Sequence, residues 1–276
     1  MKSRQIFGQR LLVIVVCIVW QSLAGQMYTV PAGMRSMGLG GVSVALADGF
    51  ALFNNPSALP VLDHSGICLA VQNRFWVSDL NVFQGAGHFK LNSNQHLGIG
   101  LTSMGIDGFS ENHLTAGYGF KIIRPFSAGI RLNLTHYQLA ERGSLFVPHA
   151  DIGARYAVSQ TFAVSMMYFN PFQIRRIRQY DEYFPGGIGL GFSHEVGSNL
   201  WLFTEISKVE RSPVQYRFGI EWKWIEHLWI RSGYSHTNSA FSLGLGVAWK
   251  SLLVNVSFMH MALPGGTSGV DFSYQW

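Results

Sequence analysis

The chain has 276 residues, of which 13% are charged, 48% are hydrophobic and 14% are aromatic. Soluble domains carry about 25% charged residues, so the composition argues against an ordinary soluble domain. The formal charge of +5 falls to +2 without residues 1–24, which hold three of the twenty basic residues and no acidic one, and no basic patch remains for nucleic acid.

Residues 1–24 have the pattern of a cleaved secretory signal peptide. Lys2, Arg4 and Arg10 precede an apolar run over residues 11–20, and small residues follow it. A membrane anchor is the alternative, but ten apolar residues are too few for a bilayer core of about 30 Å. After cleavage Cys68 is the remaining cysteine, which excludes an intrachain disulfide and a two-cysteine metal or redox site.

Residues 25–64 lack the alternation of a strand and carry a glycine-rich motif. The motif consists of Arg35, Gly38, Gly40 and Gly41 within Met-Gly-Leu-Gly-Gly, then Asp48, then Asn55 and Pro56 within Asn-Pro-Ser-Ala-Leu. It resembles the opening of the FadL-like outer-membrane proteins, including the PorV/PorQ branch. The resemblance implies a short N-terminal hatch in the periplasmic mouth of a fourteen-stranded barrel. A phosphate-binding loop is a poor alternative, because no P-loop lysine and no GxGxxG follow.

Residues 65–276 alternate between apolar and polar side chains in about fourteen segments, and no apolar run reaches the ~20 residues of a membrane-spanning helix. A soluble β-sandwich also alternates, but it does not need so apolar and aromatic a composition. We therefore predict an all-β fold, a transmembrane antiparallel β-barrel of about 14 strands with an N-terminal hatch or plug. The segments begin near Ile67, Phe83, Leu97, Leu114, Ile130, Ala150, Phe162, Ile188, Leu200, Val214, Leu228, Phe241, Val254 and Val270.

The links between these segments predict the orientation of the barrel. Every second link is very short, such as Arg124-Pro125 and Lys250-Ser251, whereas the others are generally longer, including 105–111, 139–148 and 170–186. Outer-membrane barrels have short periplasmic turns and longer outer loops. An even strand number then places both termini in the periplasm of a bacterial outer membrane.

The inward faces of the strands carry glycines and charges of both signs. Glycines such as Gly98, Gly117, Gly189 and Gly244 leave room for a hatch, a lipid tail or a water path. The charges either line an aqueous pore or pair with one another and hold the hatch; we favour pairing, because unpaired charges are costly in a partly dry lumen. The selected lumen residues are Arg131, Arg155, Glu205, Arg217, Glu221, Arg231 and Asp271.

No residue set indicates an enzyme, a metal site or a cofactor. His149 and Asp151 share a face and His136 lies on the neighbouring strand, but polar wall residues explain these positions better than acid–base catalysis. The link 170–186 carries three arginines, at 175, 176 and 178, which either contact lipopolysaccharide phosphates or, as we prefer, pair with acids of the same loop.

The last seven residues have the pattern of a closing barrel strand. Phe272, Tyr274 and Trp276 alternate with polar residues and would face lipid. We expect the barrel-assembly machinery to recognise this segment, and outer-membrane lipid and lipopolysaccharide to surround the barrel.

Two functions fit the sequence. The first is a FadL-like barrel that binds or passes small hydrophobic molecules, with the hatch shifting to open a path. The second is a non-transporting accessory role in type IX protein secretion and surface attachment, with secretion-system components as partners, as resemblance to the PorV/PorQ branch implies.

Overall fold

A computed structural model describes residues 31–140, 143–172, 185–237, 239–262 and 264–276. The predicted signal peptide, residues 25–30 of the predicted hatch and the arginines of the link 170–186 lie outside them. Within the described residues, no helix has both the length and the apolar character needed to cross a membrane.

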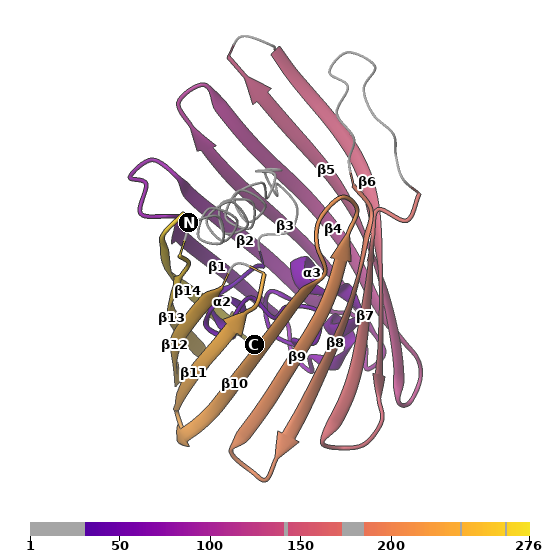
Figure 1. The fold of residues 1–276 in the computed structure, drawn as a ribbon. Coiled ribbons are helices and arrows are strands. Elements are labelled where there is room, and N and C mark those ends of the chain that lie inside the picture. The colour runs from indigo at the N-terminus through magenta and orange to yellow at the C-terminus, as the bar shows by residue number, and fades with distance from the viewer. Residues whose placement is uncertain (1–30, 141–142, 173–184, 238, 263) are drawn as a thin grey trace, which may run out of the picture. The chain divides into compact units, whose positions relative to one another are not determined.

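The predicted barrel of fourteen antiparallel strands is confirmed (Figure 1). Each strand pairs with its neighbours in the sequence, and β1 pairs with β14 to close the ring. Closure matters because it leaves no open sheet edge in lipid. The strands are β1 (Gly66–Asn73), β2 (Asn81–Lys90), β3 (Gln95–Ile106), β4 (Phe109–Ile123), β5 (Phe126–Leu139), β6 (Gly143–Ala157), β7 (Phe162–Phe169), β8 (Gly187–Val196), β9 (Leu200–Val209), β10 (Gln215–Ile225), β11 (Leu228–Ser235), β12 (Ala240–Trp249), β13 (Leu252–His260) and β14 (Gly266–Gln275).

Alternation along the strands sorts side chains between the outer surface and the lumen. On β5, the exposed fractions of Ile130, Leu132 and Leu134 are 40%, 60% and 39%, whereas their neighbours Arg131, Asn133 and Thr135 are 7%, 8% and 0% exposed. The other strands show the same distribution, with large apolar side chains on the outer surface and polar side chains in the lumen. Soluble proteins have the opposite distribution. An apolar exterior on a closed barrel is the arrangement required of a membrane-spanning one.

The predicted long links at 105–111 and 139–148 are wrong. Strands β3 and β4 continue to a two-residue turn, Asp107-Gly108, in which Gly108 has φ of 80°. Glycine suits the second position of this turn, because it adopts positive φ without a steric cost. Strand β6 begins at Gly143, so most of the second predicted link is strand. Strands β3 to β6 are therefore the longest in the wall, at 12 to 15 residues.

Residues 31–64 form short helices that pack on the inner wall. The helices are α2 (Met34–Gly38), α3 (Ala51–Asn54) and the 3-10 helix η1 (Pro56–Val61). Helix α2 contacts β11 to β14, while η1 contacts β3 to β6 on another part of the wall. In Figure 1 the helices α2 and α3 lie within the ring of strands.

Candidate functional site

Inward glycines of the wall make the space that residues 31–62 occupy. A Cβ on Gly233 would lie 2.0 Å from the backbone nitrogen of Gly40, and one on Gly117 would lie 2.4 Å from a methyl carbon of Leu52. A Cβ on Gly129 would likewise lie 2.4 Å from the carbonyl carbon of Pro56, and one on Gly244 would lie 3.1 Å from Cα of Gly38. Of the three occupants considered for the glycine-lined space, the structure therefore places the N-terminal segment there. Gly187 is an exception, because its nearest atoms belong to β9.

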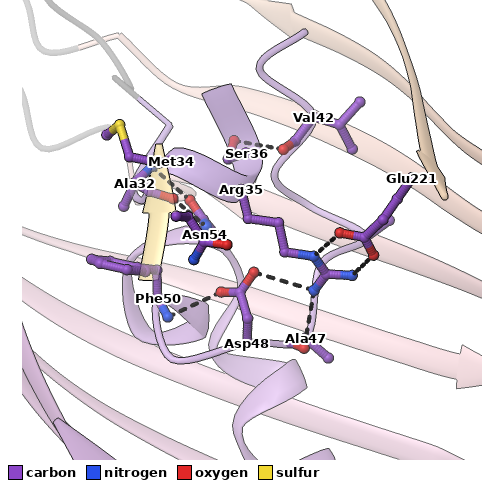
Figure 2. A network of polar contacts seen from close by, with 12 residues as sticks. Ala32, Met34, Arg35, Ser36, Val42, Ala47, Asp48, Phe50, Asn54 and Glu221 are labelled. Carbon is purple, nitrogen blue, oxygen red and sulfur yellow. Dashed lines mark hydrogen bonds and ion pairs between the residues drawn. The ribbon is translucent and has the colours of Figure 1, made fainter. Parts of the chain in front are cut away.

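Arg35 joins this segment to the wall through a partly buried charge network (Figure 2). Its Nε and Nη2 donate to the two carboxylate oxygens of Glu221 on β10, at 2.9 and 2.7 Å, and its Nη1 donates to Asp48 at 3.3 Å. Such a bidentate contact is the stronger form of an arginine–carboxylate pair. Burial by itself lowers the pKa of Arg35, but Glu221 and Asp48 outweigh burial and raise it above its ordinary value.

The network continues from Glu221 around the wall to the start of the segment. Arg231 donates to Glu221 and, at 2.8 Å, to Asn255, which donates to Asp271 at 2.7 Å. The other oxygen of Asp271 accepts from the backbone nitrogen of Met34. Two strands of the wall, β10 through Glu221 and β14 through Asp271, thus hold the same short helix, because α2 carries both Met34 and Arg35.

A second contact holds the stretch after α2. One oxygen of Glu205 accepts from the backbone nitrogens of Ser43 and Val44, at 2.7 and 2.8 Å, and the other accepts from Arg217. Nearby, Gly40 has φ of 74° and donates to the hydroxyl of Ser242 at 2.8 Å. The close approach and the positive φ explain why glycine occupies this position.

A third contact involves Arg131 and Asp151 beneath α3. Asp151 accepts from Arg131 at 2.6 Å, from Asn133 at 2.9 Å and from the backbone nitrogen of Asn170 at 2.8 Å. Arg131 also donates to the carbonyl of Phe53. Arg155 donates to the carbonyl of Ala45 at 3.1 Å. Each of the seven selected lumen residues therefore bonds either to residues 31–62 or to a wall residue that bonds to them.

Asn55 and Pro56 shape the turn between α3 and η1. The side-chain oxygen of Asn55 accepts from the backbone nitrogen of Ser57 at 3.1 Å and caps η1, while its amide donates to the carbonyl of Val44 at 2.9 Å. Proline is favoured at the first helical position, because its missing N–H needs no partner there. These residues fold the segment back on itself.

The structure does not bring the considered histidines together. His149 faces the lumen, whereas His136 stacks on Phe146, an exposed residue of the outer surface, with ring centroids 4.3 Å apart. His113, which was not among the histidines selected from the sequence, bonds to Glu111 at 2.7 Å and to Thr135 at 2.8 Å. Thr135 has no exposed surface, so this trio lacks an accessible nucleophile. No group of three or more candidate ligands could hold a metal ion among the described residues.

The links β2–β3, β4–β5, β6–β7, β8–β9, β10–β11 and β12–β13 all have two to four residues, and we call the end of the barrel where they lie the short-turn end. A cavity of about 380 Å³ opens beside residues 31–62 near this end. Arg35 and Arg155 line it together with the aromatic residues Phe162, Trp201 and Phe203. The turn residues Pro125 and Thr161 border it, which places it at the end where β4 joins β5 and β6 joins β7. The aromatic lining was not identified from the sequence.

Solved structures with a similar fold exist, but no sequence relative was found. No protein-family model matches the chain, and no curated protein matches it. The toluene transporter TodX of Pseudomonas putida is similar in structure, with a TM-score of 0.71 at 11% identity over 89% of this chain and 99% of that one. The Ralstonia pickettii toluene transporter TbuX has a TM-score of 0.69 at 12% identity over 89% and 98%. A Pseudomonas aeruginosa FadL homologue has a TM-score of 0.65 at 13% identity over 88% of this chain and 97% of that one. The chain therefore shares its fold with these barrels.

Proposed function

We propose that the protein is a FadL-like barrel of the bacterial outer membrane that binds or passes small hydrophobic molecules. The observation that carries the proposal is the N-terminal segment, which lies along the inner wall and is held by side-chain contacts instead of strand pairing. Contacts of this kind break without opening the barrel, so the segment can shift while the wall stays closed. The fold shared with two toluene transporters supports the same class of solute.

We infer that the short-turn end faces the periplasm. All six links at that end have two to four residues, and β14 finishes there beside the start of β1. Short turns are typical of the periplasmic end. Residues 31–62 would then act as a hatch on the route to the periplasm.

Uptake by cells tests the proposed function. Cells with an intact lipopolysaccharide layer, with and without the expressed protein, are given radiolabelled toluene or a radiolabelled disaccharide, and initial uptake is measured. We expect faster toluene uptake and no change for the disaccharide. Faster entry of the sugar would indicate an aqueous pore, and no effect on toluene would contradict hydrophobic passage.

The resemblance of the glycine-rich motif to the PorV/PorQ branch supports the second candidate, an accessory role in type IX secretion. In that case, deletion in the native host would block release of secreted cargo, and affinity purification would recover secretion components. Normal secretion in the deletion strain would contradict this candidate.

A further inference from the structure

Arg155 differs from the other arginines of the charge network. Arg35, Arg131, Arg217 and Arg231 each pair with a carboxylate. Arg155 instead donates from Nη1 to the carbonyl of Ala45 and to the hydroxyl of Ser165, both at 3.1 Å. Among the described residues, no carboxylate lies within ion-pair distance of it.

This cation lies on the wall of the cavity near the short-turn end. Its Nη1 atom is engaged by Ala45 and Ser165, so Nε and Nη2 remain available for a ligand in the cavity that the side chain lines. Arg35 lines the same cavity, but its charge is offset by Glu221 and Asp48. A partly buried cation without a counterion costs free energy. An anion that binds beside Arg155 would supply the counterion, so its binding is favoured.

The remaining lining defines the rest of the ligand. Phe162, Trp201 and Phe203 provide aromatic surface, and the hydroxyl of Ser193 is a further polar group. A volume of about 380 Å³ is at the small end of ligand pockets, which span about 300–1,000 Å³. A compact, flat ligand with one anionic group fits these features. A carboxylate matches the guanidinium because two parallel hydrogen bonds form between them.

We propose that this cavity binds a small aromatic carboxylate of the benzoate type, with the carboxylate on Arg155 and the ring against the aromatic lining. That such a carboxylate passes through the barrel rests on the proposed function, because the cavity lies at one end of the proposed path. Binding itself requires only the folded barrel.

Glu195 provides an internal control of opposite sign. It lines the cavity, and no described cation pairs with its carboxylate. Its negative charge opposes an anionic ligand in the same space. Neutralising it is therefore expected to strengthen binding, whereas neutralising Arg155 weakens binding.

Isothermal titration of the detergent-solubilised full-length protein with benzoate and with toluene tests the inference. We expect benzoate to bind more tightly than toluene. Arg155→Gln should weaken benzoate binding by at least about tenfold, because a charge-assisted contact is lost, and should weaken benzoate binding more than toluene binding, because toluene has no carboxylate. Arg155→Lys should retain part of the affinity, since it keeps the charge but loses the bidentate geometry. Glu195→Gln should bind benzoate more tightly than the parent protein.

Heat-modifiable migration on gels confirms that each variant is a folded barrel, and the lysine variant tests the site if the glutamine variant does not fold. No benzoate binding by the parent protein, or equal binding by Arg155→Gln, would overturn the inference. Toluene uptake without benzoate binding would leave the proposed function standing, and benzoate binding without toluene uptake would refute the proposed function alone.

Discussion

The Glu221→Gln variant is expected to release residues 31–62 from the wall while the barrel remains closed. Glu221 is the carboxylate shared by Arg35 on the segment and Arg231 on the wall. The substitution leaves the buried guanidinium of Arg231 and the partly buried guanidinium of Arg35 without that countercharge, and breaking a buried pair in this way costs about 3–5 kcal/mol. This cost destabilises the attachment of residues 31–62 and not the barrel, because β10 keeps its backbone hydrogen bonds to β9 and β11.

Limited proteolysis and bilayer conductance measure this release. We expect the variant's N-terminal segment to be cut faster and its conductance to rise, with heat-modifiable migration unchanged. Lys223→Gln is the matched control, because Lys223 lies two positions along the same strand and its described contact is with the ring of Trp229. Parent-like protease resistance and conductance in Glu221→Gln would show that the network does not hold the segment.

Deletion of Tyr274 to Trp276 is expected to abolish assembly in the outer membrane. Tyr274 pairs with Ile67, Gln275 pairs with Gly66, and Trp276 exchanges backbone hydrogen bonds with Ser65. Without them the end of the β1 edge is left open, and lipid cannot satisfy unpaired backbone groups. If the assembly machinery also recognises the exposed aromatic side chains, the truncated protein fails before it is inserted into the membrane.

Heat-modifiable protein in isolated outer membranes measures assembly, while cleavage of the predicted signal peptide would report export across the inner membrane. The double variant Tyr274→Ala/Trp276→Ala keeps the backbone ladder, so it separates recognition of the side chains from closure of the barrel. Trp249→Ala, at the same end of β12, controls for the loss of an exposed aromatic residue. Normal amounts of folded barrel after the deletion would refute both roles of the tail.

Period-two alternation made the wall predictable from the sequence. The inward residues of β5 and β14 could be named because each lies between apolar neighbours that must face lipid. Strand ends were less predictable, because the Asp107-Gly108 turn is a hairpin signal within a stretch that otherwise reads as a polar loop.

The pairing of the lumen residues could not be predicted in the same way. Alternation shows that Glu221, Arg231 and Asp271 point inward, but their partners depend on barrel tilt and on the path of a segment with no periodicity. Asn255, which links Arg231 to Asp271, lies between Val254 and Val256 and could have been selected by the same rule. The lack of a described carboxylate beside Arg155 has no signature in the sequence at all.

A reversible cross-link between the N-terminal segment and the wall tests most directly whether passage requires the segment to move. A Cβ on Gly189 would lie 3.0 Å from Cγ2 of Val44, which is about the separation of a disulfide's Cβ from the distal sulfur. The pair Val44→Cys/Gly189→Cys is placed in a Cys68→Ala background, with each single cysteine variant as a control. We expect oxidation to reduce toluene uptake to that of cells without the protein, and dithiothreitol to restore it. Unchanged toluene uptake through the oxidised, cross-linked protein would contradict the account.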